Sequence, residues 1–251
     1  NVQYLDAQFT RNADGSWNTF GEANRIAKNT TYIVTHEAGQ LANFRKFALL
    51  GDPALTPAFP KYNIQLDNVM DGTTQVHADS INALGKYVMS GSVRDLSGNI
   101  LNDFNGQVFI TFFDKPRKIT TITSANASFN VHDNIVYKGK VSVTNGKFAF
   151  TFITPKDINY YFGTGKLSMY ADNGITDAAG ADTSLTVGGY SDNPIISTTP
   201  PVVKPYINDT LFLNGGITGS NTSLYVSLFS ETGINVSGNK IGHDLTAILD
   251  N

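Results

Sequence analysis

The chain has 251 residues, of which 41% are hydrophobic and 16% are charged, and its formal net charge is -3. These values suit a soluble globular protein of one large or two to three small domains, and they exclude the strongly basic surface that binds nucleic acid or an anionic membrane. Because the chain has no cysteine, disulfides, thiolate metal sites and a cysteine nucleophile are excluded within these residues.

Residues 17–50 have the periodicity of two amphipathic helices. Thr19 and Glu22 have the spacing of a capping box, in which the hydroxyl and the carboxylate each satisfy a backbone N–H that is free at the helix start. Apolar side chains then recur at spacings of three and four along one face. They are Phe20, Ala23, Ile26 and Ala27.

The second helix is predicted from apolar residues at threefold spacing, Leu41, Phe44 and Phe47. It is expected to end by residues 51–53, where glycine permits a tight exit and proline disfavours helical geometry in the residue before it. A short linker stiffened by two prolines follows, up to residue 61. We expect Phe44, Phe47 and Leu50 to be buried, so that Phe47→Ala would cost on the order of 3 kcal/mol.

From residue 62 the hydrophobic period changes from helical to alternating. Short β-branched or aromatic runs are divided by turn residues, which is the pattern of a sandwich. The runs cover residues 107–113, 119–123, 135–143, 147–153 and 166–170. We therefore predict an immunoglobulin-like β-sandwich over residues 62–190. The aromatic row Phe148, Phe150 and Phe152 is interpreted as a buried strand face.

The dipeptide Asn145-Gly146 predicts a two-residue hairpin turn, because both central positions of that turn need positive φ and these residues tolerate it best. Its flanks, residues 138–144 and 147–154, are therefore predicted to pair as strands. Further turns are predicted at residues 95–99 and 172–174.

Residues 191–205 contain four prolines among serines and threonines and are predicted to be an extended linker. A further β-domain is predicted to start at residue 206, with strands at 224–229 and 245–249. Since these strands are too few to close a sandwich, residues 206–251 are expected to be a truncated domain that docks on a neighbour or exposes an unpaired edge.

Two segments of the helical part resemble the closing helices of the gingipain family of cysteine peptidases. They are Gly21 to Lys28 and Phe44 to Leu55, of which the second is the more specific motif. Later motifs resemble the β-domain that follows the peptidase domain in PorU-type members of this family. They begin at Tyr137, Asn145, Pro155, Gly165, Asn214, Gly233, Ile241 and Ile248, in the family's order. The resemblance extends over nearly the whole chain.

The resemblance implies a parent protein that is a cysteine-type endopeptidase (peptidase C25), a sortase or signal peptidase of the type IX secretion system. Such proteins use a Cys-His pair to cleave the sorting signal of secreted cargo at the bacterial outer surface, and some then attach the cargo to anionic lipopolysaccharide. The family's cysteine and histidine lie before the matched region. The chain is therefore expected to hold no catalytic, cofactor-binding or metal-binding residue and to be inactive alone.

The expected fold is mainly β. Residues 1–61 would be the helical end of an α/β peptidase domain, followed by the sandwich and a partial second β-domain. The expected partners are the upstream peptidase domain, outer-membrane components of the secretion system and the cargo proteins, with no nucleic acid. The expected location is extracellular, at the bacterial outer-membrane surface, and the segment itself has no apolar run near the roughly 18 residues that span a bilayer.

Three histidine-acid pairs are candidate sites. His36 with Glu37 could form a base with an orienting carboxylate, but no nucleophile motif accompanies them, and a helix start is the better interpretation. His132-Asp133 and His243-Asp244 lack the spacing of metal ligands and are interpreted as surface or turn residues.

Side chains with carboxylate or amide oxygens near the glycines of residues 172–182 could offer ligands to calcium. They are Asp172, Asn173, Asp177 and Asp182. Their spacing does not match a twelve-residue calcium loop, so no metal is predicted.

Two alternatives to the peptidase-tail hypothesis remain. The chain could be an adhesive or carbohydrate-binding module, for which the run Tyr160-Tyr161-Phe162 is the one candidate surface. It could also be a structural spacer between a catalytic head and a membrane partner.

Overall fold

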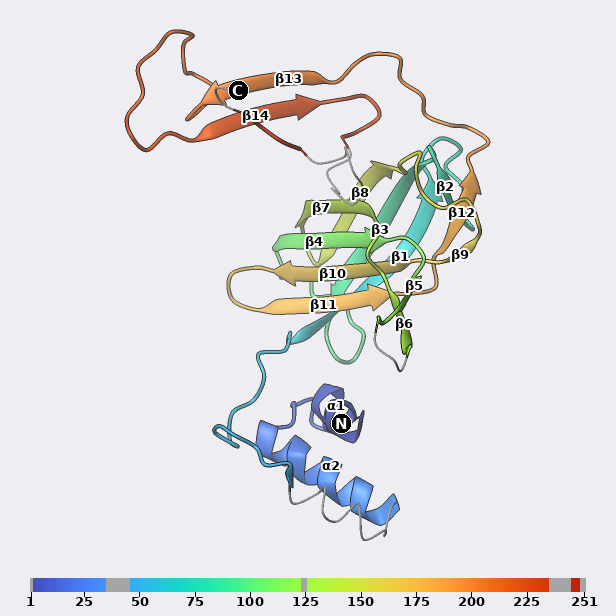
Figure 1. Cartoon of the computed structure of the whole chain (residues 1–251), viewed down its shortest axis with the longest axis vertical. Coiled ribbons are helices and arrows are strands. Elements are labelled where there is room, and N and C mark those ends of the chain that lie inside the picture. Colours follow the sequence, from blue (N-terminus) through green and yellow to red (C-terminus); the bar gives the residue numbers. More distant parts are fainter. Residues whose placement is uncertain (1, 35–45, 123–125, 235–244, 249–251) are drawn as a thin grey trace. The chain divides into compact units, whose positions relative to one another are not determined.

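The computed structural model describes residues 2–34, 46–122, 126–234 and 245–248 (Figure 1). The chain divides into two compact units, Asn1–Lys61 and Tyr62–Asn251, each of which is described by itself. None of the helices in the described ranges is long and apolar enough to cross a membrane.

The first unit contains helices α1 (Val2–Phe9) and α2 (Phe20–Val34). The predicted helix start at Thr19 is confirmed, because its Oγ1 accepts a hydrogen bond of 3.1 Å from the backbone N–H of Glu22. The other half of the capping box is absent, since the Glu22 carboxylate pairs with Arg25 one turn further on. Helix α1 was not predicted; its eight residues are too few to establish a helical period.

The loop between the two helices is fastened by reciprocal amide hydrogen bonds. Gln8 Nε2 donates to the carbonyl of Asn18 at 3.0 Å, and Asn18 Nδ2 donates to the carbonyl of Ala7 at 2.8 Å. Both amide side chains are buried, and each satisfies a polar group of the other segment.

The proline-containing segment before residue 62 packs on this helical unit. The Phe59 ring lies 4.8 Å from the Trp17 ring, and the guanidinium carbon of Arg11 lies over the Trp17 ring, 4.1 Å from its centroid. Arg11 also donates to the carbonyl of Pro60 at 2.8 Å. These contacts attach the segment to the first unit up to the residue at which the sheet begins.

The burial predicted for the second helix is wrong. Phe47 is 61% exposed and Leu50 is 93% exposed, and residues 47–50 are not helical. The chain returns to α2 without regular secondary structure, and Gly21 N donates to the carbonyl of Pro53 at 2.9 Å. Outside a helix, side chains at threefold spacing are not collected on one face. Leu41 and Phe44 lie outside the described residues.

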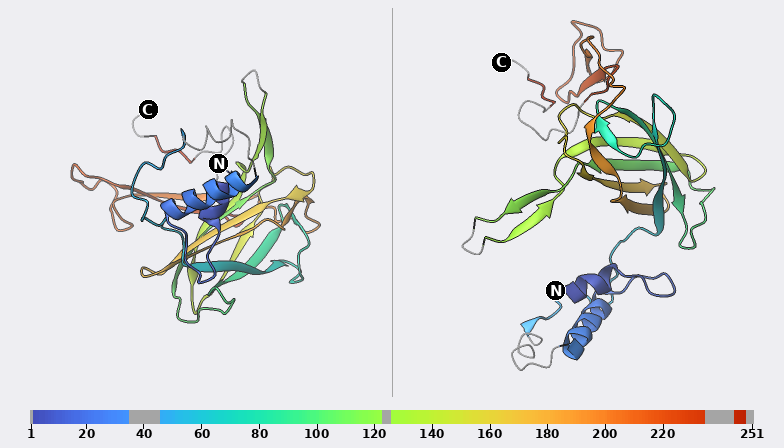
Figure 2. Two further views of the ribbon diagram at one scale, coloured as in Figure 1. Left: turned by 90° about the horizontal axis from the view of Figure 1, so that it is seen from below. Right: turned by 90° about the vertical axis from the view of Figure 1, so that its right-hand side faces the viewer.

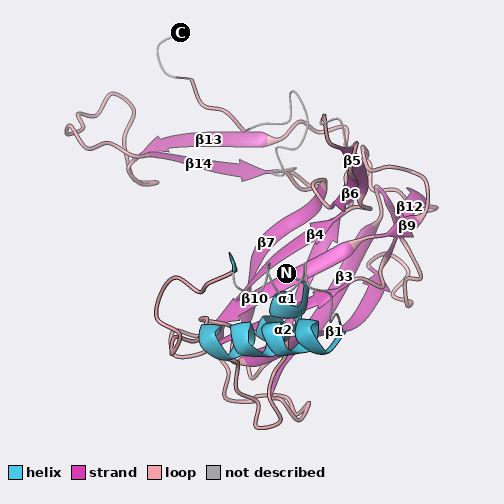
Figure 3. Ribbon diagram, turned by 60° about the horizontal axis from the view of Figure 1, so that its bottom comes forward, coloured by secondary structure: helices cyan, strands magenta, loops and turns pink. Residues whose placement is uncertain are grey.

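The second unit is built on a seven-stranded sheet of order β7-β4-β10-β11-β1-β3-β8 (Figures 1 and 3). Its strands are β1 (Tyr62–Asp71), β3 (Lys86–Arg94), β4 (Gly106–Phe113), β7 (Ile135–Val143), β8 (Lys147–Ile153), β10 (Lys166–Asp172) and β11 (Asp177–Asp182). Smaller sheets have the orders β2-β12-β9, β5-β6 and β13-β14. Their strands are β2 (Ile81–Ala83), β5 (Arg117–Thr120), β6 (Ser128–Val131), β9 (Gly163–Thr164), β12 (Thr186–Tyr190), β13 (Val202–Ile207) and β14 (Leu224–Phe229).

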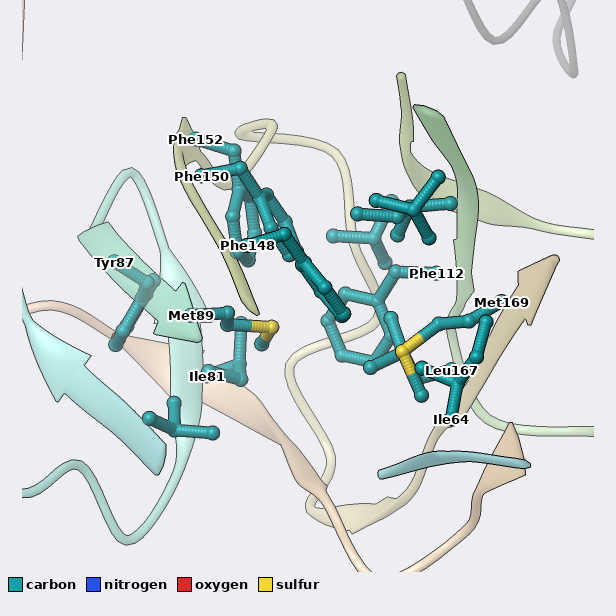
Figure 4. Packing of buried hydrophobic residues seen from close by; sticks show 14 of the residues in the cluster. Ile64, Ile81, Tyr87, Met89, Phe112, Phe148, Phe150, Phe152, Leu167 and Met169 are labelled. Carbon is teal, nitrogen blue, oxygen red and sulfur yellow. The ribbon is translucent and has the colours of Figure 1, made fainter. Parts of the chain in front are cut away.

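The large sheet curls over one hydrophobic core, which confirms the predicted mainly β fold and sandwich architecture (Figure 2). Its neighbouring strands are antiparallel except β1 and β11, which share a short parallel pairing at Tyr62↔Ala178 and Asn63↔Ala179. This short seam joins the strands β7-β4-β10-β11 to the strands β1-β3-β8. Side chains from both groups of strands meet in the core, as Figure 4 shows.

The aromatic row of β8 is buried as predicted. Phe148, Phe150 and Phe152 are each 5–6% exposed, and the residues between them are exposed. The ring of Phe152 lies 6.0 Å from that of Phe112 in β4, and the ring of Phe150 stacks 5.1 Å from that of Tyr137 in β7. The row therefore connects the two groups of strands across the core.

The turn between β7 and β8 is confirmed, but the strand pair predicted around it is wrong. Asn145 and Gly146 have φ of 49° and 69°, as the two-residue turn requires. Only the bridge Thr144↔Lys147 joins the flanks, while β7 pairs with β4 and β8 pairs with β3. The Gly146 carbonyl instead accepts a hydrogen bond from Val93 N of β3, and Gly146 N donates to the carbonyl of Phe104 in the loop after β3. The two strands lie at opposite edges of the sheet.

We expect Gly146→Ala to destabilise the protein more than Gly98→Ala does. Both glycines have positive φ, so each alanine should cost about 1–2 kcal/mol in backbone strain. A Cβ at position 146 would also lie 2.4 Å from the Leu101 carbonyl oxygen, whereas one at position 98 would meet nothing within 4 Å. That clash should add about 1–3 kcal/mol. Urea unfolding measures both variants, and equal losses would contradict the close approach.

The strands predicted at residues 135–143, 147–153 and 224–229 agree with β7, β8 and β14 at both ends, whereas other predictions in this unit differ from the structure. The strand expected at residues 119–123 is β5, which begins at Arg117 and pairs with the unpredicted β6. The predicted linker over 191–205 is shortened, because β13 begins at Val202 and pairs with β14. The strand expected at 245–249 is not observed, since residues 245–248 are not in a strand and residue 249 lies outside the described residues.

Candidate functional site

A buried ion pair lies at the end of β4. Asp114 is 2% exposed, and its Oδ1 accepts a hydrogen bond of 2.6 Å from Lys115 Nζ. The same ammonium donates to the carbonyls of Asn159 at 2.9 Å and Val187 at 3.0 Å. All three of its donors are therefore used, and they connect β4 to β12 and to the loop after β8.

The Asp114 carboxylate has three further donors: Lys115 N at 2.8 Å, Asn134 Nδ2 at 3.1 Å and Asn159 N at 3.2 Å. Burial by itself opposes ionisation of this carboxyl, but the hydrogen bonds and the charge of Lys115 outweigh burial and lower its pKa. The group is charged and fully hydrogen-bonded. It can support neighbouring loops, but it has no free position from which to transfer a proton.

The loop that this ion pair supports exposes three consecutive aromatic side chains. Tyr160, Tyr161 and Phe162 are 47%, 83% and 65% exposed. The backbone N–H of Tyr161 donates to Asn159 Oδ1 at 3.0 Å, and the Tyr160 hydroxyl donates to the carbonyl of Lys156 at 2.7 Å. Exposed aromatic side chains on a hydrogen-bonded loop are typical of a contact surface.

Two glycines of β12 allow the aromatic loop to lie against the sheet. Gly189 N donates to the carbonyl of Tyr160 at 2.8 Å. A Cβ at Gly188 would lie 2.7 Å from the Tyr161 carbonyl oxygen, and one at Gly189 would lie 2.7 Å from the Phe162 ring. The sequence analysis found the aromatic run but missed this support, although a glycine pair in a strand is a known signal of close backbone approach.

The histidine-acid pair at residues 132–133 has structural partners. His132 Nδ1 lies 2.9 Å from the carbonyl oxygen of Asp114, and Asp133 forms an ion pair with Arg117. The pair lies in the segment between β6 and β7. The pairs His36-Glu37 and His243-Asp244 lie outside the described residues.

The four candidate calcium ligands do not converge. Asp172 and Asp177 are paired at one end of the β10–β11 hairpin, and Asn173 accepts hydrogen bonds within its turn. Asp182 is opposite Leu167 at the other end of the hairpin. Within the described ranges, no group of three or more His, Cys, Asp or Glu side chains is placed to hold a metal ion.

Comparison with solved structures gives a match over most of the chain. No protein-family model and no curated protein matches the chain. The crystal structure of dimeric latent PorU from Porphyromonas gingivalis aligns with a TM-score of 0.57 and 28% identity, over 94% of this chain and 23% of that chain. The chain is therefore related in structure to PorU and spans less than a quarter of its length.

Two further structures align with low scores. The sporulation control protein Spo0M from Bacillus subtilis aligns with a TM-score of 0.30 and 16% identity, over 53% of this chain and 51% of that chain. A β-glucosidase from Listeria innocua, crystallised with gluconolactone, aligns with a TM-score of 0.24 and 11% identity, over 54% of this chain and 17% of that chain. Neither supports an argument about fold or function.

Proposed function

We propose that this chain is the non-catalytic carboxy-terminal region of a gingipain-type surface peptidase of the PorU kind, acting in type IX secretion. The observation that carries the proposal is the extent of the PorU alignment, which covers 94% of the chain and therefore includes residues of both compact units. A match to the sandwich alone would indicate only a widespread fold. The motifs at residues 21–28 and 44–55 add a resemblance to the end of a peptidase domain.

The proposed role of the sandwich is to support the peptidase domain of the parent protein. The chain has no cysteine, so it cannot supply the nucleophile of a cysteine peptidase. In the described residues of the sandwich, the buried charged pair, Asp114 and Lys115, is engaged in holding loops. The proposed partners are the upstream peptidase domain, outer-membrane secretion components and secreted cargo, at the bacterial surface.

A second candidate function is adhesion to a glycan or protein surface through the aromatic loop. It is favoured by the exposure of Tyr161 and Phe162, whose rings present apolar faces on a fixed backbone. In this function the sandwich would be a binding module and its removal would leave the peptidase domain intact.

Deletion of residues 62–190 from the parent protein should lower the stability of its peptidase domain, together with cargo processing. Thermal unfolding and cleavage of a cargo reporter would be measured separately. Tyr161→Ala with Phe162→Ala is the matched test of the aromatic loop and should leave both readouts unchanged. The 251-residue chain alone should cleave arginine and lysine reporter peptides only at the background rate.

Two outcomes would contradict the support role. One is lost processing by a peptidase domain of unchanged stability after the deletion, which would indicate recognition of cargo or partner by the sandwich. The other is lost processing in the double aromatic variant, which would favour the binding module.

A further inference from the structure

The two edge strands of the large sheet leave an opening between them. Among the described strands, β7 pairs only with β4 and β8 pairs only with β3, so each has one free edge. The end of β7 and the start of β8 lie together at the turn of Asn145 and Gly146, and the strands diverge away from it. Where they are apart, the start of β7 and the end of β8 line a cavity of about 420 Å³.

The wall of this cavity is apolar and aromatic. Val136 and Tyr137 of β7 and Phe152 of β8 line it, and the rings of Tyr137 and Phe152 lie 5.2 Å apart. Figure 4 shows Phe152 in the aromatic row of β8. Thr154 also lines the cavity, and its buried Oγ1 has no hydrogen-bond partner among the described residues. An unpaired buried hydroxyl is destabilising until a ligand or water satisfies it.

The charged residues around the cavity have an excess of positive charge. Lys138 and Lys156 line it, against one carboxylate, Asp157. Lys138 and Lys156 are both exposed, so their ammonium groups can reach a ligand that enters from solvent. A ligand with an acidic group is therefore favoured over a basic one.

The occupant that fits this opening is a polypeptide strand. A free strand edge presents backbone N–H and C=O groups in a row, which another extended backbone can pair with. The segment after β14 contributes Thr232, Gly233 and Ile234 to the cavity lining, so a polypeptide segment already lies beside the opening. A small apolar molecule would fill the aromatic wall but would leave the strand edges unpaired.

We propose that the opening between β7 and β8 binds an extended peptide that carries a carboxylate, by adding a strand to the free edge of β8. Apolar side chains of the peptide would contact Tyr137 and Phe152. Its carboxylate would face Lys138 and Lys156. This inference does not depend on the proposed role of the parent protein.

Position-specific trapping tests the site on the 251-residue chain, which has no cysteine of its own. Thr151→Cys introduces a thiol at the cavity, and Ala149→Cys places one on the same exposed row of β8 but outside the lining. The probe is a hexapeptide of alternating valine and threonine that ends in aspartate and carries one activated mixed disulfide. We expect it to trap Thr151→Cys at least about tenfold faster, because binding raises the local concentration of the disulfide.

A binding assay separates strand addition from charge attraction. A fluorescent form of the same hexapeptide should bind in a saturable manner, and N-methylation of its alternate amides should abolish binding because methylated amides cannot donate to a strand edge. Lys138→Glu should weaken binding about tenfold or more. Lys140→Glu, also exposed on β7 but outside the lining, is the matched control and should have a smaller effect.

Three results would overturn the proposal: equal trapping rates at positions 151 and 149, undiminished binding of the N-methylated peptide, or equal losses in the two lysine variants. Absence of saturable binding by the unmodified hexapeptide would also overturn it. Unchanged thermal unfolding of each variant shows that an altered rate or affinity is local. None of these results affects the parent-protein deletion experiment, so the two proposals can fail separately.

Discussion

Asp114→Ala should lower the free energy of unfolding by about 3–5 kcal/mol, because removing one member of a buried ion pair leaves the other charge without compensation. Asp114 is 2% exposed and accepts hydrogen bonds from Lys115, Asn134 and Asn159. Its loss would leave the Lys115 ammonium with only two carbonyl acceptors. Urea unfolding at neutral pH measures the effect.

The matched control is Asp133→Ala, which removes an exposed ion pair with Arg117. Exposed pairs contribute about 0–1 kcal/mol, so this variant should be nearly as stable as the unaltered chain. Similar losses in the two variants would show that the Asp114 pair is solvated and that its described burial is wrong.

The same ion pair should contribute to acid sensitivity. The pKa of Asp114 is lowered in the folded protein, so its stabilisation is present above the unfolded-state pKa of about 3.9 and is lost as the pH falls through the lower folded value. Stability should therefore fall less steeply below about pH 4 in Asp114→Ala than in the unaltered chain. Urea unfolding at each pH would compare the two proteins. Parallel curves of unfolding free energy against pH would contradict a lowered pKa of Asp114.

Phe152→Ala should also destabilise the protein by about 3–5 kcal/mol, the usual range for truncating a buried phenylalanine. Phe152 is 5% exposed, and its ring lies within 6.0 Å of the rings of Tyr87, Phe112 and Tyr137. These partners come from β3, β4 and β7, so the truncation would open a cavity where the two groups of strands meet. Thermal and urea unfolding should both show that Phe152→Ala is less stable than the unaltered chain.

Phe47→Ala provides the same chemical change at an exposed position. Phe47 is 61% exposed, and a surface substitution of this kind changes stability by about 0.5 kcal/mol or less. A large loss in this variant, or a small one in Phe152→Ala, would contradict the burial that separates the two sites.

The aromatic row of β8 and the turn before it could be predicted because each depends on local information. Phe148, Phe150 and Phe152 alternate with residues suited to solvent, and this period is a direct consequence of the strand pleat. Asn145 and Gly146 tolerate positive φ whatever surrounds them. The sequence therefore established the mainly β fold, and the lack of cysteine established that no thiol chemistry resides in this chain.

The pairing of the strands was decided only in the tertiary structure. A two-residue turn usually joins paired strands, yet β7 and β8 are at opposite edges of the sheet, and the Gly146 backbone bonds to Val93 of β3 and to Phe104 of the following loop. Those hydrogen bonds join residues 53 and 42 positions apart, and no local pattern encodes them.

The candidate sites depended on the tertiary structure to the same extent. In the sequence, Asp114-Lys115 is an ordinary pair of charged residues; it becomes a buried support only because Asn134, Asn159 and Val187 close over it. The sequence predicted burial for both Phe47 and Phe152, but only Phe152 is buried in the structure. A hydrophobic period predicts one apolar face but not the element that covers it. The sequence by itself determined several of the strands, the turn and the absence of thiol chemistry, whereas the burial of Asp114 and the strand partners were decided by contacts between distant segments.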